Sequence, residues 1–147
     1  MTISTTKTAC RNDRRRMIVV DASAVLAIIL GEEEADIFED ALAAAAGALI
    51  SPVNYWEVLV RSQGEFGQVG VDHAETLMEQ ANIAIAPSDR ETARAAAKAF
   101  ARFKGRPGGR LNMGDCFAYA LAVQEGDGLL FKGNDFTKTV VKNALGG

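Results

Sequence analysis

The sequence predicts an α/β fold in which helices cover both faces of a central, mainly parallel sheet. Short apolar runs of strand length alternate with longer helical segments, which is the pattern of parallel α/β proteins. The chain of 147 residues is long enough for one domain with a substantial core and too short for two ordinary domains. We therefore expect one domain over 17–147, after a polar, aperiodic segment over 1–16 that is a disordered extension or a tag.

The expected elements follow one another in a regular order. Strands are expected in the short apolar runs over 17–20, 48–51, 83–86 and 128–131. Helices are expected over 23–30, 33–46, 52–66, 71–81, 88–103 and 113–124, with a glycine-rich basic loop over 104–111. Pro52 suits the first turn of a helix, and Ser88 with Glu91 three residues later matches a capping box.

Composition excludes several broad classes of protein. The net charge of −3 gives no overall attraction to nucleic acid, so such binding would need a local basic patch. Two cysteines, Cys10 and Cys116, are too few for a disulfide framework, and they favour a reduced, cytoplasmic protein. The apolar run over 17–30 is interrupted by Asp21 and is shorter than the ~20 residues of a spanning helix. We therefore expect neither a signal peptide nor a membrane segment.

Acidic residues occur near the ends of predicted strands or the beginnings of predicted helices. Asp21 ends the first apolar run, and Asp135 closely follows the last. Glu57 lies early in the helix that begins at Pro52, and Asp115 lies at the head of a later helix. Ligands of parallel α/β sheets bind at the carboxyl ends of the strands, so these carboxylates are predicted to face one cleft. Carboxylates gathered in this way need a cation, and oxygen ligands suit Mg²⁺ or Mn²⁺.

Each of these acidic residues also has a purely structural explanation. Asp21 could cap the helix that follows it, and Asp115 could favour a helix N-terminus through the helix dipole. Glu57 could pair with Arg61 at the next helical turn, and Asp135 could belong to an ordinary turn. The hypothesis of a metal site therefore does not depend on any one of these residues. It is supported by the predicted placement of all four at one edge of the sheet.

Other common kinds of catalytic site lack their residues. The single histidine, His73, lies in a polar stretch and is expected at the surface. A Ser-His-Asp triad and a zinc site of cysteines and histidines are therefore excluded as hypotheses. The sequence also contains no P-loop motif and no dinucleotide-binding glycine motif.

A basic stretch without acidic residues lies between Glu91 and Asp115. Its cationic residues are Arg94, Lys98, Arg102, Lys104, Arg106 and Arg110. The first three are spaced four apart and share one helix face, whereas the last three lie on the loop that leads to Asp115. The alternative for the helix is a solvated face that balances the acidic run over 32–40. For the loop we favour contact with a phosphodiester backbone, and we assign substrate binding to Arg102, Lys104, Arg106 and Arg110.

Three segments of the chain resemble PIN-domain ribonuclease toxins of the VapC type. They are VVDASA over 19–24, RLNMGDCFAYALA over 110–122, and LLFKGNDF over 129–136; NYWEVL over 54–59 matches loosely. The resemblance spans 17 to about 142 and implies a PIN-like three-layer α/β/α sandwich. It also implies RNA cleavage dependent on Mg²⁺ or Mn²⁺, a homodimer, and inhibition by a cognate antitoxin.

The resemblance also implies roles for particular residues. Asp21 and Asp115 match direct metal ligands, and Glu57 matches a further ligand or a carboxylate that orients water. Asp135 would complete the acidic set, and Ser23 would support the metal site with its hydroxyl. Asn134 stands where relatives often carry another acidic residue, which is a departure from the family pattern.

The function expected from the sequence is that of a toxin endoribonuclease in a type II toxin–antitoxin pair, cleaving RNA phosphodiester bonds. Asn134 leaves open an alternative, a catalytically weak PIN-fold module that acts mainly by binding an antitoxin-like partner. A phosphatase with Asp21 as its nucleophile is a weaker hypothesis, because the related dehalogenase-like pattern has an aspartate where this chain has Ser23.

Overall fold

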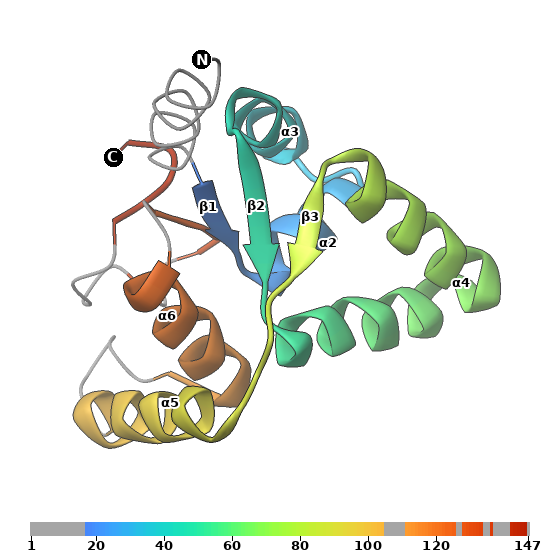
Figure 1. The fold of residues 1–147 in the computed structure, drawn as a ribbon. Helices are drawn as coiled ribbons and strands as arrows, with labels where there is room; N and C mark the ends of the chain where they lie inside the picture. The colour runs from blue at the N-terminus through green and yellow to red at the C-terminus, as the bar shows by residue number, and fades with distance from the viewer. Residues whose placement is uncertain (1–16, 105–110, 126–127, 134–135, 137–141, 147) are drawn as a thin grey trace, which may run out of the picture.

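Helices pack on both faces of a central sheet (Figure 1). The structure is a computed structural model that describes residues 17–104, 111–125, 128–133, 136 and 142–146. The expected extension over 1–16 lies outside the described residues, as do the predicted site residues Arg106, Arg110, Asn134 and Asp135.

Within the described residues, the sheet has four parallel strands in the order β3-β2-β1-β4. Their bounds are Met17–Val20 for β1, Gly47–Ile50 for β2, Ile83–Ile85 for β3 and Leu129–Leu130 for β4. Strand β1 lies between β2 and β4, and Val19 pairs with Leu49 on one side and with Leu129 on the other. The prediction of a mainly parallel sheet is therefore confirmed.

Helices cover the sheet in two layers. Their bounds are Ala22–Ile29 for α2, Ala35–Ala44 for α3, Pro52–Gln80 for α4, Arg90–Phe103 for α5 and Met113–Glu125 for α6. Helices α2, α3 and α4 form one layer, and α5 packs on α6 to form the other (Figure 1). The result is the three-layer α/β/α sandwich expected from the sequence.

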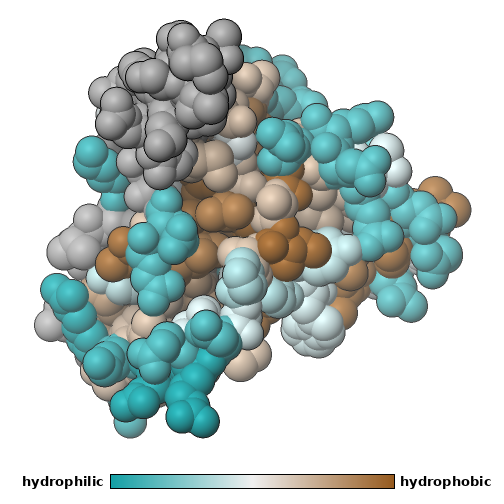
Figure 2. All heavy atoms as spheres, viewed as in Figure 1, coloured by the Kyte–Doolittle hydropathy of each residue, from teal (hydrophilic) through white to brown (hydrophobic). Residues whose placement is uncertain are grey.

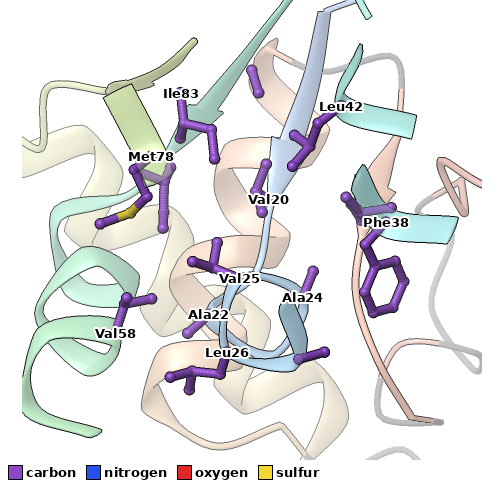
Figure 3. Packing of buried hydrophobic residues seen from close by; sticks show 14 of the residues in the cluster. Val20, Ala22, Ala24, Val25, Leu26, Phe38, Leu42, Val58, Met78 and Ile83 are labelled. Atoms are coloured by element: carbon purple, nitrogen blue, oxygen red, sulfur yellow. The ribbon is translucent and has the colours of Figure 1, made fainter. Parts of the chain in front are cut away.

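Alternate residues of β1 supply the two cores. Successive side chains of a strand point to opposite faces of the sheet. Ile18 and Val20 accordingly pack in the cluster with α2, α3 and α4, where Val25, Val58 and Met78 lie (Figure 3). Val19 points the other way, into the cluster formed with α5 and α6. Burial on both faces explains why the strand is apolar throughout rather than alternating with polar residues.

Helix α4 is kinked at Gly67. The sequence predicts two helices over 52–66 and 71–81, and the kink lies close to the boundary between them. Gly67 has φ 68° and ψ −154°, a conformation that is essentially restricted to glycine. The kink lets the two halves of α4 turn back toward each other, and the Tyr55 hydroxyl donates a hydrogen bond to the Glu75 carboxylate across them.

Replacing Gly67 with alanine should destabilise the protein by about 1–3 kcal/mol, because alanine cannot adopt this conformation without strain. Gly64→Ala is the matched control, since Gly64 lies in the same helix with regular dihedrals and open space around its Cα. That substitution should stabilise the protein by roughly 0.5–1 kcal/mol. Urea denaturation measures both changes, and equal shifts of the same sign would contradict the role given to Gly67.

The beginning of α5 differs from the prediction by one residue. Asp89, rather than Ser88, caps the helix, and its carboxylate accepts hydrogen bonds from the backbone N–H and the hydroxyl of Thr92. The predicted capping box of Ser88 and Glu91 is therefore wrong. Both Ser and Asp suit a cap, so two adjacent candidates give the same sequence signal, and Asp89 is the one whose side chain pairs with Thr92 three residues later. The hydrogen bonds from Thr92 hold the pKa of Asp89 below its usual value.

The outer surface of α5 is hydrophilic, as expected for the predicted basic face (Figure 2). Arg94 is exposed and lies 3.9 Å from the Glu91 carboxylate, and Lys98 is also exposed. Within the described ranges, no helix combines the length and apolar character needed to cross a membrane.

Candidate active site

A cavity of about 330 Å³ lies where β1 and β2 lead into the helices that follow them. It is lined by residues of α2, α4 and the beginning of α6 together with Asp21, namely Asp21, Ala22, Ser23, Leu26, Trp56, Glu57, Val60, Arg61, Asn112 and Asp115. The cavity brings together acidic residues that are 36 to 94 positions apart in the sequence, at the carboxyl edge of the sheet where ligands of such folds bind.

Asp21 is held between β1 and α2. Its backbone N–H donates to the carbonyl of Leu130 in β4 at 2.9 Å, and its Oδ2 accepts from the backbone N–H of Ser23 at 3.0 Å. Asp21 is therefore the N-cap of α2, as the structural explanation proposed, and it also lines the cavity.

Ser23 connects α2 to the end of the sheet beyond β4. Its Oγ accepts a hydrogen bond from the backbone N–H of Lys132 at 3.0 Å. The Lys132 ammonium lies 2.9 Å from Glu32 Oε1 and 3.5 Å from Glu34 Oε1, and these contacts raise the pKa of Lys132. Ser23 thus holds the beginning of α2, next to Asp21, against the segment that follows β4.

Asp115 lies in the first turn of α6 and is only 8% exposed. Its Oδ2 accepts from the backbone N–H of Asn112 at 3.1 Å, and Asn112 Oδ1 accepts from the backbone N–H of Asp115 at 2.8 Å. This reciprocal pair satisfies donors at the start of the helix in the manner of a capping box. It also orients the Asp115 carboxylate at the cavity.

Glu57 reaches the cavity from the second turn of α4. Its Oε1 accepts a hydrogen bond of 2.8 Å from Asn54 Nδ2, which also donates to the carbonyl of Gly114 at 3.0 Å. The Glu57 carboxylate lies so close to Gly114 that a Cβ added there would overlap it. Glu57 is thereby placed beside the beginning of α6 and next to Asp115, and Asn54 rather than Arg61 is the hydrogen-bond partner of its carboxylate.

The sequence of the chain matches the PIN-domain family over residues 18–142. The chain belongs to the PIN-domain family. It is 38% identical over 125 residues to ribonuclease VapC of Mycolicibacterium smegmatis, covering 84% of this chain and 97% of that protein. It is also 38% identical over 131 residues to ribonuclease VapC28 of Mycobacterium tuberculosis, covering 87% of this chain and 98% of that one. The expected membership among VapC-type PIN-domain ribonucleases is confirmed.

The fold of this PIN domain resembles a solved structure of the same group. The crystal structure of Mycobacterium tuberculosis VapC20, described as a toxin that cleaves the sarcin–ricin loop, superposes with a TM-score of 0.69. The two chains share 13% sequence identity, and the similarity covers 84% of this chain and 95% of that one. At 13% identity, the similarity to VapC20 shows a shared fold and nothing further.

The donor set of the PIN-domain cavity suits a hard cation. Asp21, Glu57 and Asp115 supply carboxylate oxygens, which are the ligands that Mg²⁺ and Mn²⁺ prefer. Over the described ranges, no three carboxylate, histidine or cysteine side chains are gathered closely enough to hold an ion between them. The donor chemistry still suits Mg²⁺, because that ion usually keeps several waters and uses one or two protein carboxylates.

The sequence did not indicate several residues that line the cavity or support its carboxylates from behind. Arg61 contributes a cation to the lining, and Trp56 contributes an indole ring that is 59% exposed. Asn54 orients the Glu57 carboxylate, and Asn112 orients the Asp115 carboxylate. Both residues lie in segments that resemble the PIN-domain family, but neither was proposed as a site residue. The spacing Ser51-x-x-Asn54-x-x-Glu57 is the signal that was available for Asn54, since residues three apart share a helix face.

The predicted RNA-contacting residues in the described part of the chain lie outside the cavity lining. Arg102 is exposed on α5, and its guanidinium carbon lies 5.3 Å from the centre of the Phe103 ring. Lys104, the residue after Phe103, is also exposed. His73 is exposed on α4, as expected.

Cys116 is adjacent to Asp115 but is unsuited to nucleophilic chemistry. Burial, together with the neighbouring Asp115 charge, raises the pKa of its thiol to about 11. The thiol is therefore protonated at neutral pH, whereas a cysteine nucleophile acts as a thiolate. Cys116 fills space in the core formed by α5 and α6.

Proposed function

We propose that this chain is a metal-dependent endoribonuclease and the toxin component of a type II toxin–antitoxin pair. The observation that carries the proposal is the cavity in which Asp21, Glu57 and Asp115 lie together. The relatives named ribonuclease VapC, which align with nearly their whole length, support RNA as the substrate. The residues that line the cavity include no cysteine or histidine, so the ionisable acidic groups that face it are the carboxylates.

The cofactor we propose is Mg²⁺, with Mn²⁺ as a substitute. Asp21 and Asp115 would be its direct ligands, and Glu57 would be a further ligand or would orient water. When bound, the ion supplies positive charge that polarises a phosphoryl oxygen and activates water for attack on phosphorus. Asp135 is proposed to complete the acidic set, with support from Ser23 and Asn134.

The RNA backbone needs positive charge near the carboxylates, since phosphates and carboxylates repel each other. We assign that role to Arg102, Lys104, Arg106 and Arg110, as the sequence predicted. The position of Arg61 in the cavity lining supports adding it to this set. Arg61 is exposed and therefore accessible to a phosphate group that approaches the cavity.

The partners we propose are a cognate antitoxin and a second copy of the chain. The family membership supports both, and exposed apolar side chains on α4, Trp56, Val60, Phe66 and Val69, offer contact area for an interface. A cytoplasmic location is proposed because a free, buried Cys116 suits a reducing compartment.

Removal of the divalent metal should abolish cleavage. We expect the purified chain to cut RNA in Mg²⁺ or Mn²⁺, to lose this activity completely in excess chelator, and to regain it when Mn²⁺ is restored. The assay follows fragments of a labelled RNA by electrophoresis. Cleavage that persists unchanged after chelation would show that the proposed metal chemistry is wrong.

Calorimetric titration with Mn²⁺ separates the nuclease from the alternative binding module. A nuclease of the proposed kind should bind Mn²⁺ in the absence of RNA, through the carboxylates of the cavity. A catalytically weak module should bind Mn²⁺ negligibly and should leave RNA intact even at high protein concentration.

A further inference from the structure

We propose that Asn54 is a positioning residue that holds the Glu57 carboxylate at the metal-binding cavity. The inference rests on the proposed metal-dependent function and assigns to Asn54 a role in that site. Asn54 has no exposed surface, although it lies one helical turn from residues that line an open cavity. Burying a side-chain amide is unfavourable unless its polar atoms are hydrogen-bonded, so its contacts explain why it is there.

Every polar group of the Asn54 side chain has a partner. Oδ1 accepts from the Ser51 hydroxyl at 2.7 Å, and Nδ2 donates to Glu57 Oε1 at 2.8 Å and to the Gly114 carbonyl at 3.0 Å. The amide can take only this orientation, because a flipped amide would direct its oxygen at the Glu57 carboxylate and the Gly114 carbonyl. The backbone N–H of Asn54 also donates to Ser51 Oγ at 3.1 Å.

These hydrogen bonds connect two separate parts of the site. Asn54 and Glu57 lie at the beginning of α4, whereas Gly114 precedes Asp115 in α6, 60 residues further along the chain. One NH₂ group therefore fixes the Glu57 carboxylate relative to the backbone that carries Asp115. A neutral amide does this without adding a charge that would compete with a cation or repel it.

Gly114 supplies the other side of the same arrangement. The absence of a side chain at Gly114 leaves the space that the Glu57 carboxylate occupies. Any larger residue would push that carboxylate away from α6, because the end of a glutamate side chain moves more easily than the backbone. Asn54 and Gly114 together thus determine where Glu57 lies, one by attraction and one by leaving room.

The test is the affinity for Mn²⁺ alone, measured by calorimetry on the full chain. Asn54→Ala should lower the affinity by roughly 10-fold or more, which is the typical effect of losing a residue that orients a metal ligand. The effect should largely disappear when Asn54→Ala is introduced into the Glu57→Gln variant, because Asn54 acts through Glu57. A purely structural role would give the same loss in both backgrounds.

A matched control separates positioning from stability. Thr92→Val removes a buried, hydrogen-bonded hydroxyl group in α5, outside the cavity lining. It should lower the melting temperature and leave the affinity for Mn²⁺ unchanged. Asn54→Ser retains a small polar group and serves as the second variant if Asn54→Ala does not fold. Gly114→Ala should lower the affinity while the protein stays folded, because alanine favours the helix.

The outcomes distinguish this inference from the proposed function. If the wild-type chain binds no Mn²⁺, the metal-dependent function and the inference both fail. If the wild type binds Mn²⁺ and a folded Asn54 variant binds it equally well, only the inference fails. An equal loss in the wild-type and Glu57→Gln backgrounds would also overturn it.

Discussion

Replacing Asp21 with asparagine should lower the rate of RNA cleavage by roughly 10³-fold and leave the fold intact, on the scale seen when one group that stabilises transition-state charge is removed. Asparagine has the same shape as aspartate but lacks the negative charge that binds a cation. It caps helices as well as aspartate does, so its oxygen can still accept the hydrogen bond from the backbone of Ser23. The substitution therefore separates the catalytic role of Asp21 from its role as the cap of α2.

Single-turnover cleavage in Mn²⁺ and thermal unfolding are the two measurements for this variant. The melting temperature should remain within about 3 °C of the wild type, corresponding to less than about 1 kcal/mol. Asp36→Asn is the control of equal charge, because Asp36 is exposed in the first turn of α3. It should cleave RNA at the wild-type rate. Undiminished cleavage by Asp21→Asn would refute the assignment of Asp21 to the metal site.

Phe103→Ala should reduce the free energy of unfolding by about 3–5 kcal/mol. The Phe103 ring is 1% exposed and packs edge-to-face on Tyr119, with ring centres 5.3 Å apart. Phe103 is the last residue of α5, and Tyr119 belongs to α6, so the pair holds the two helices together. Alanine would leave a cavity at this contact, which the surrounding helices can close only in part.

Phe100→Ala is the matched control for this loss of packing. Phe100 lies one turn earlier in the same helix and is 40% exposed. Its replacement should have a smaller effect, because a large part of the Phe100 surface is already exposed to solvent, and alanine is the better helix former. Urea denaturation of the two variants measures the difference. Similar losses for both would mean that Phe103 does not anchor α5 on α6.

The sheet and its layers were predictable because they depend on local patterns. Strand β1 is apolar at every position, which is required when Val19 faces one helical layer and Val20 the other. The exact residue at which a helix begins was harder to predict from the sequence. Ser88 and Asp89 are adjacent and both suit a helix cap, so the sequence signal alone does not choose between them, and Asp89 is the cap in the structure.

The placement of Asp21, Glu57 and Asp115 around one cavity was predictable for a different reason. Asp21 and Asp115 adjoin a strand end and a helix start, positions that a parallel sheet brings to one edge. Asn54 was not singled out, because its role depends on a contact with Gly114 that only the folded chain makes. Arg61 was considered only as a partner for Glu57, whereas in the structure it lines the cavity.

The pairing of β1 with β4 has a consequence for synthesis of the protein on the ribosome. Asp21 is synthesised more than 100 residues before Leu130, to which its backbone N–H donates a hydrogen bond. Asp115 belongs to α6, the helix that precedes β4. A nascent chain that ends before Leu129 lacks the strand that completes this side of the sheet. The backbone anchor of Asp21 can therefore form only after the ribosome has added Leu130, so the cavity is assembled late relative to its first acidic residue.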